Sequence, residues 1–153
     1  MFKKILVGLD FSPASSEALL MAAGLAARYG AFLTLLHVHD AAPYTLSSDF
    51  ELFTAEQRDR LREQLEKALA AAQLQARAAG VVSVQTRLLE GPPANVIARY
   101  AEEGGFDLVV LATHGRRGLQ HAMLGSVAER VVRLAPCPVL TLRPTAKADG
   151  GQG

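Results

Sequence analysis

The segment 112–126, which reads ATHGRRGLQHAMLGS, combines glycines, arginines and a serine in a pattern that suits anion binding. Gly115 and Gly118 permit positive φ angles and let a ligand approach the backbone closely. Gly125 and Ser126 stand at an expected helix start, where free N–H groups and the helix dipole attract negative charge. The segment is therefore the first candidate for a functional site.

Both side chains and backbone groups of this segment could contact a phosphate. The Ser126 hydroxyl and the N–H groups of Ser126 and Val127 would donate hydrogen bonds. Arg116 and Arg117 add positive charge, although exposed loop arginines also commonly lie in solvent. A second interpretation stays open, in which the glycines only form turns and Ser126 only caps a helix.

Three histidines raise the alternative of a metal site. His37 and His39 are two residues apart on an expected strand, so they share a face, and His114 follows a later strand. Asp10 and Asp40 are the only carboxylates at a suitable spacing, and no cysteine accompanies them. A hydrogen-bonded histidine is the commoner outcome, so we expect no metal site formed by the protein alone.

The elements that position these residues follow from apolar periodicity and capping signals. Short apolar runs predict strands at residues 5–7, 32–38, 82–89, 106–111 and 139–142. Helices are expected between them, and their starts are marked by Ser12 before Pro13, by Thr54 with Gln57, by Gly91 before two prolines, and by Ser126 with Glu129. Residues 43–53 are expected to form a loop and residues 144–153 a disordered tail.

Regular alternation of strands and helices predicts the α/β class. We expect a single doubly wound, Rossmann-like, five-stranded parallel sheet with strand order 3-2-1-4-5 and helices on both faces. In such sheets ligands bind beyond the carboxyl ends of the strands, at the switch point. The ends at residues 8–10, 38–40 and 112–115 would then meet at one crevice.

Composition narrows the class of protein further. The chain has 153 residues, half of them hydrophobic, and a formal net charge of +1, so no strong field draws it to nucleic acid or to a membrane surface. We expect one domain, no signal peptide and no membrane span. One cysteine, Cys137, allows no internal disulfide and fits a cytoplasmic location. It lies between two prolines, and we interpret it as a small core side chain.

Over residues 2–143 the chain resembles the universal stress protein family. The resemblance is carried by KKILVGLDFSPASSEAL near the start, by LLHV, and by DLVVLATHGRRGLQHAMLGSVAERVVRLAPCPVLTLR. Members that bind ATP share a motif of glycine, two residues, glycine, nine residues, then glycine with serine or threonine. These positions fall here on Ala112, Gly115, Gly125 and Ser126, so the spacing matches and one glycine is replaced.

The resemblance implies ATP binding at matched positions. Asp10 would lie beside the ribose, with Mg²⁺ bound near it, and the Val38 backbone would contact the adenine. Gly115, Gly125, Ser126 and Val127 would hold the phosphates. Two alternatives stay open. Asp10 could serve only in an Asx-type turn before the first helix. Ala112 would matter little in extended backbone but would weaken binding at a positive φ, or if the ribose packs on its Cα.

The resemblance also implies a homodimer. The last strand, formed by Val139, Leu140, Thr141 and Leu142, would lie at a sheet edge and pair antiparallel with the same strand of a second copy. The alternative is that the C-terminal tail covers this edge. Taken together, the sequence predicts a nucleotide-dependent regulatory module of the stress response that is not an enzyme. The alternatives are a dimeric interaction protein that binds no nucleotide and, with less support, a slow ATPase. For the slow ATPase, no residue is evident as a general base.

Overall fold

The computed structural model describes residues 1–40, 54–113 and 124–144, and every structural statement below refers to these residues. Strands and helices alternate along the chain in the order β1 Lys4–Gly8, α1 Pro13–Tyr29, β2 Phe32–His39, α2 Ala55–Ala78, β3 Val84–Glu90, α3 Pro93–Glu103, β4 Leu108–Ala112, α4 Ser126–Leu134 and β5 Val139–Leu142. The expected tail at 144–153 and the loop at 43–53 lie almost entirely outside the described residues.

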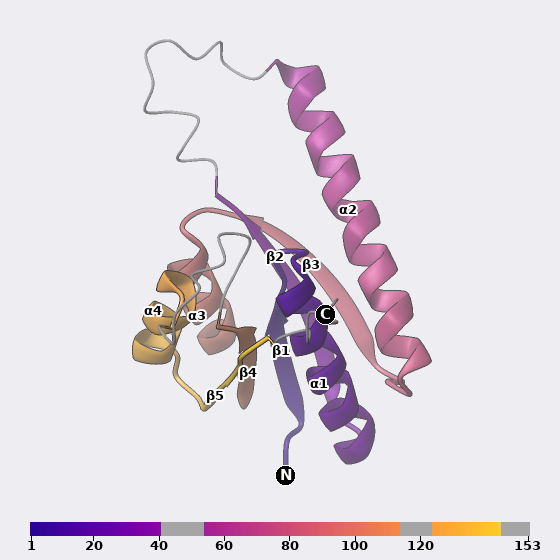
Figure 1. Ribbon diagram of the computed structural model, residues 1–153, viewed down its shortest axis with the longest axis vertical. Helices are drawn as coiled ribbons and strands as arrows, with labels where there is room; N and C mark the ends of the chain where they lie inside the picture. The colour runs from indigo at the N-terminus through magenta and orange to yellow at the C-terminus, as the bar shows by residue number, and fades with distance from the viewer. Residues whose placement is uncertain (41–53, 114–123, 145–153) are drawn as a thin grey trace, which may run out of the picture.

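The five strands form one parallel sheet with the order β3-β2-β1-β4-β5, so the predicted topology is confirmed. Helices α1 and α2 cover one face and α3 and α4 cover the other (Figure 1). Each face carries its own apolar core, because successive side chains of a strand point to opposite faces. Ile5, Val7 and Val110 belong to the first core, and Leu6 and Val109 to the second.

Local capping explains where two of the longer helices begin. Ser12 caps α1 by accepting a hydrogen bond from the Ser15 N–H at 3.1 Å, and Pro13 occupies the first helical position. Thr54 and Gln57 form the predicted capping box of α2. Gly30 ends α1 with φ 65°, a left-handed conformation that glycine adopts without strain.

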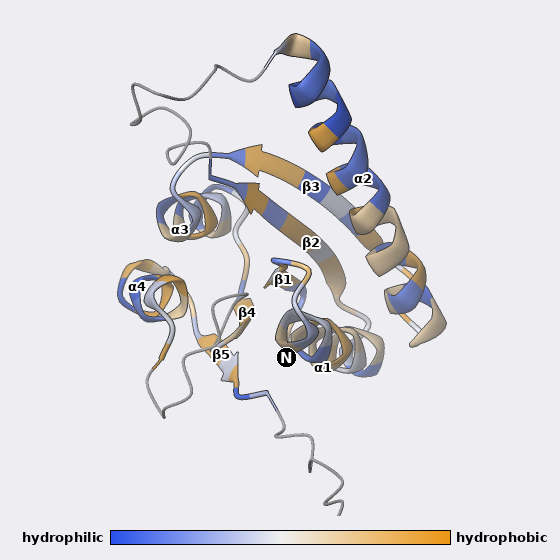
Figure 2. Cartoon of the chain, turned by 45° about the horizontal axis from the view of Figure 1, so that its top comes forward, coloured by the Kyte–Doolittle hydropathy of each residue, from blue (hydrophilic) through white to orange (hydrophobic). Residues whose placement is uncertain are grey.

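Helix α2 extends beyond the sheet, and its first turns are strongly hydrophilic (Figure 2). Exposed ion pairs Arg62–Glu66 and Glu63–Lys67 stabilise these turns locally. Its second half packs through Leu69 against the first core. None of the described helices combines the length and apolar character that a membrane span requires.

Candidate functional site

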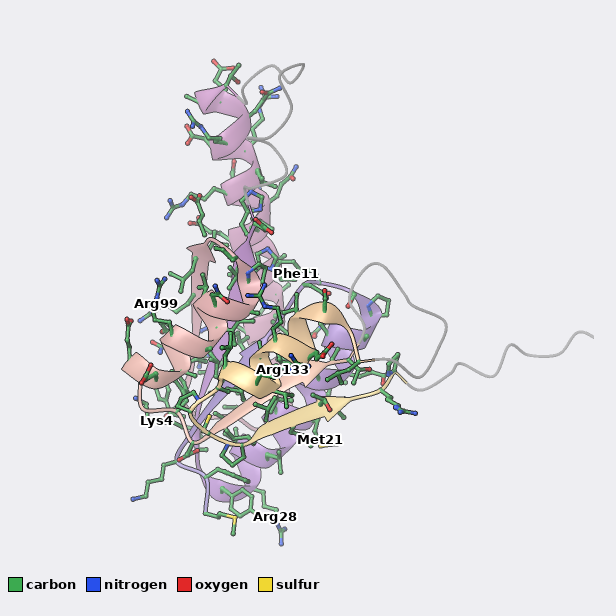
Figure 3. All side chains as sticks on the ribbon, turned by 90° about the vertical axis from the view of Figure 1, so that its left-hand side faces the viewer. Lys4, Phe11, Met21, Arg28, Arg99 and Arg133 are labelled. Carbon is green, nitrogen blue, oxygen red and sulfur yellow. The ribbon has the colours of Figure 1, made fainter. Side chains whose placement is uncertain are left out.

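The carboxyl ends of β1, β2 and β4 meet at one cavity of about 570 Å³. Strand β1 lies between β2 and β4, so the chain leaves the sheet in opposite directions at this point, as expected for a ligand-binding crevice. In Figure 3, Phe11 lies toward this end of the molecule, and Lys4 and Arg28 lie toward the other. The described lining residues are Gly8, Leu9, Asp10, Ser15, Leu36, His37, Val38, Asp40, Pro93, Ile97, Leu111, Ala112, Thr113, Gly125, Ser126, Val127 and Ala128.

The cavity brings together six of the eight residues that the sequence proposed for the site. These are Asp10 after β1, Val38 in β2, Ala112 at the end of β4, and Gly125, Ser126 and Val127 at the start of α4. The other two, Gly115 and Arg116, lie outside the described residues, as do Arg117, Gly118 and His114. Residues nearly 120 positions apart in the chain thus line the same cavity.

Asp10 forms an Asx turn within the β1–α1 connection. Its Oδ1 accepts a hydrogen bond from the Ser12 N–H at 2.9 Å, which is the local role that the sequence left open. Its Oδ2 makes no hydrogen bond or ion pair to another described residue. The turn therefore holds the carboxylate at the cavity wall and leaves one oxygen for other contacts.

Ala112 stands where the family motif has its first glycine. It is the last residue of β4, paired with Leu142 of β5, and its φ is not positive. Extended backbone accepts a methyl group without strain, so this alanine imposes no conformational penalty on the site. Of the two unfavourable alternatives for Ala112, a positive φ is therefore excluded, and packing of the ribose on its Cα stays a prediction.

Helix α4 begins differently from the sequence prediction, and the expected capping box of Ser126 and Glu129 is wrong. Gly125 is the N-cap residue, and Ser126 is already helical. The Glu129 N–H, which in that capping box would donate to the Ser126 hydroxyl, donates instead to the Gly125 carbonyl at 2.9 Å, and the Gly125 N–H donates to the Thr113 carbonyl at 2.6 Å. Glu129 pairs with Arg133 at 2.8 Å. The Ser126 hydroxyl is therefore not used for capping and lies at the cavity.

His37 ties the β1–α1 turn to β2. Its Nδ1 lies 2.6 Å from the Leu9 carbonyl oxygen, and the Leu9 N–H donates to the Leu36 carbonyl at 2.8 Å. An Nδ1–H donor is the arrangement that satisfies this carbonyl. Within the described ranges, no three histidine, cysteine, aspartate or glutamate side chains gather closely enough to hold a metal ion.

Sequence reasoning missed two residues beside the cavity. Phe11 has φ 62°, the one positive φ outside glycine among the described residues, and its ring lies 4.7 Å from the His37 ring. No sequence signal indicates this, because phenylalanine rarely adopts such an angle. Thr113 lies inside the quoted motif, and its position directly after a buried strand was the signal that could have identified it.

Cys137 is half-buried and packs against the second core. Burial raises the pKa of the thiol, and the negative charge of Asp107 raises that pKa further. The thiol therefore stays protonated near neutral pH, in keeping with its interpretation as a small core side chain.

The family model and two of the most similar curated proteins agree on one family. The model of the universal stress protein family matches residues 1–143. Universal stress protein YxiE of Bacillus subtilis is 38% identical over 149 residues, covering 94% of this chain and 100% of its own. Universal stress protein MJ0531 of Methanocaldococcus jannaschii is 36% identical over 150 residues, covering 96% of this chain and 85% of its own.

Solved structures show the same architecture. Protein MJ0577 superposes with a TM-score of 0.84 at 28% identity, covering 95% of this chain and 99% of its own. A universal stress protein in complex with cAMP gives 0.71 at 24% identity, over 93% and 97% of the two chains. One from Archaeoglobus fulgidus in complex with dAMP gives 0.64 at 23% identity, over 93% and 97%. The chain belongs to the universal stress protein family.

Proposed function

We propose that this protein binds ATP in the cavity at the carboxyl ends of β1, β2 and β4, and that occupancy of the site regulates a cytoplasmic stress response. The observation that carries the proposal is the convergence of Asp10, Val38 and the first turn of α4 on one cavity of about 570 Å³. Pockets of 300–1,000 Å³ typically hold a cofactor-sized ligand. We assign no catalytic residue to the cavity.

The cavity is lined both by apolar side chains and by the start of a helix, and we propose that these hold the adenine and the phosphates of a nucleotide. Leu36, Pro93 and Ile97 line the part between β2 and α3, where the adenine would pack beside the Val38 backbone. The first N–H groups of α4 have no partner within the helix and would donate to phosphate oxygens.

Charge balance favours ATP as its magnesium complex. The described lining residues include the carboxylates of Asp10 and Asp40 and neither lysine nor arginine. A triphosphate would therefore meet negative charge unless Mg²⁺ lay between it and Asp10. The helix dipole of α4 supplies roughly half a unit of positive charge. Arg116, which would add a full charge, lies outside the described residues.

Two relatives of the same fold were solved with cAMP and with dAMP. Those proteins show that this fold is able to hold an adenine nucleotide. Support for such a ligand in the present chain comes from its own cavity, and support for the triphosphate comes from the motif spacing between Ala112 and Ser126.

Calorimetric titration with ATP and Mg²⁺ tests the proposal. We expect saturable binding that weakens when Mg²⁺ is omitted. Asp10→Asn keeps an oxygen for the Ser12 N–H and removes the charge, so it should reduce affinity while leaving the turn intact. Glu63→Gln, on the exposed part of α2, is the matched control and should bind as the wild type does.

The absence of binding up to millimolar ATP would contradict the proposal and favour a family member that acts by protein interaction alone. Steady production of ADP and phosphate at a rate comparable with nucleotide exchange would contradict the non-enzymatic role.

We further propose a homodimer formed through β5. This strand is at the edge of the sheet, and its four residues Val139–Leu142 are all half-buried. The three apolar side chains among them and the open edge favour pairing with a second copy of the strand. This proposal is independent of nucleotide binding.

A further inference from the structure

Thr113 follows β4 directly and carries a hydroxyl that the protein leaves without a partner. The residue is 5% exposed, and its Oγ1 is the one buried side-chain oxygen or nitrogen in the described part of the chain that has no hydrogen bond. Buried hydroxyls almost always have a hydrogen-bond partner, because a hydroxyl that loses its contacts with water and gains none within the protein costs free energy. This exception calls for a physical cause.

The other buried hydroxyl side chains are all satisfied. Ser12 Oγ accepts from the Ser15 N–H at 3.1 Å, Ser15 Oγ donates to the Ser12 carbonyl at 3.0 Å, and Thr34 Oγ1 accepts from Gln85 Nε2 at 3.0 Å. These three buried hydroxyls therefore have hydrogen-bond partners within the protein. The residue that carries the unpaired hydroxyl, Thr113, lines the cavity.

The backbone of Thr113 is held firmly on both sides. Its N–H donates to the Leu142 carbonyl at 2.8 Å, and its carbonyl accepts from the Gly125 N–H at 2.6 Å. The residue therefore links β5 to the N-terminus of α4. Only the side chain can turn, by one staggered step about χ1, which changes the direction of the hydroxyl without breaking either bond.

Thr113 is joined through its carbonyl to Gly125, the N-cap residue at the positive end of α4. Side chains alternate along β4, so Thr113 points to the same face as Leu111, the face that α3 and α4 cover. Thr113 lines the same cavity as Gly125 and Ser126. Helix α4 begins at Ser126 and is nine residues long, which is more than two turns, so it has a helix dipole. An unpaired, buried donor beside unpaired helix N–H groups is a suitable arrangement for an anion.

We propose that the Thr113 hydroxyl is a phosphate ligand that donates to a phosphoryl oxygen of the bound nucleotide. The inference rests on the proposed function and adds a residue that the family motif leaves as a variable position. The ligand would supply the acceptor that the protein lacks. Thr113 therefore contributes to the affinity for phosphorylated adenosine and not to the affinity for adenosine itself.

The test uses Thr113→Val, which has nearly the same shape without the hydroxyl, and Thr113→Ser, which keeps it. Titration with Mg²⁺ and ATP should show affinity reduced about tenfold for the valine variant and little changed for the serine variant. Adenosine, measured by competition, should bind both variants and the wild type equally. Urea unfolding without ligand should show the valine variant at least as stable as the wild type, because an unsatisfied polar group has been removed.

The outcomes separate this inference from the proposed function. A wild type that binds ATP and a valine variant that binds it equally well overturn the inference alone. So does an equal loss of ATP and adenosine affinity, or a valine variant that is less stable than the wild type without ligand, because the hydroxyl would then have a partner within the protein. A wild type that binds no nucleotide overturns both.

Discussion

At Gly8 the packing of the sheet against α3 leaves no room for a side chain. A Cβ built on this residue would lie 2.5 Å from Leu111 Cδ2 and 3.5 Å from Ile97 Cδ1. Leu111 is 5% exposed and lines the cavity, so its side chain can give way only toward the candidate ligand site. We expect Gly8→Ala to lower the free energy of unfolding by about 1–3 kcal/mol, as overpacking does. Urea denaturation measures this directly.

Gly24→Ala is the matched control for that substitution. Gly24 lies within α1, and a Cβ there would meet nothing within 4 Å. Alanine favours a helix over glycine, so the stability should rise by about 0.5–1 kcal/mol. Equal effects of the two substitutions would contradict the packing account of Gly8.

The element that shapes the site most is the β1–α1 turn. Its geometry depends on Phe11, whose φ of 62° is unfavourable for a residue with a Cβ and whose ring packs near His37. Phe11→Ala should lose the packing and keep the strain, whereas Phe11→Gly loses both. We therefore expect the glycine variant to be more stable than the alanine variant by about 1 kcal/mol.

Urea denaturation of the two Phe11 variants, with the wild type beside them, checks this order. The same pair should bind ATP less tightly than the wild type, because Asp10 is held by the turn that Phe11 helps to form. A glycine variant no more stable than the alanine variant would show that the left-handed angle carries no strain.

For the whole molecule, the proposed homodimer depends on the open edge of β5. The Pro138 carbonyl accepts from the N–H of Val109 in β4, and the Leu142 carbonyl accepts from the N–H of Thr113, directly after β4. In a parallel pair the backbone groups of alternate residues point to the same side, so those of Val139 and Thr141 face the open edge. Thr141→Pro removes an outward N–H and leaves the pairing with β4 intact.

We expect Thr141→Pro to convert the proposed homodimer to a monomer in sedimentation experiments, with the unfolding transition retained. Thr141→Ala keeps the N–H and should remain dimeric. A proline variant that still dimerises would exclude pairing through β5, and a monomeric wild type would exclude the homodimer itself.

Much of this architecture was readable from residues alone. Alternating apolar runs, the Ser12 and Thr54 caps and the stop at Gly30 are local signals, and they predicted the elements and the doubly wound sheet correctly. The start of β3 was placed two residues early, because Val82, although apolar, is 88% exposed. The loop pattern indicated the candidate residues around the start of the last helix, the family resemblance assigned roles to Asp10, Val38 and Ala112, and the described candidates line one cavity.

The sequence by itself determined which segments form strands and helices and which side chains face each core, because these depend on periodicity and on contacts between near neighbours. Only the tertiary structure decided what surrounds the site. The bond between Gly125 and Thr113 sets the start of α4, the ring of His37 meets Phe11, and Thr113 keeps an unpaired hydroxyl. Each of these depends on groups brought together by the order of the strands, and no local pattern in the sequence encodes them.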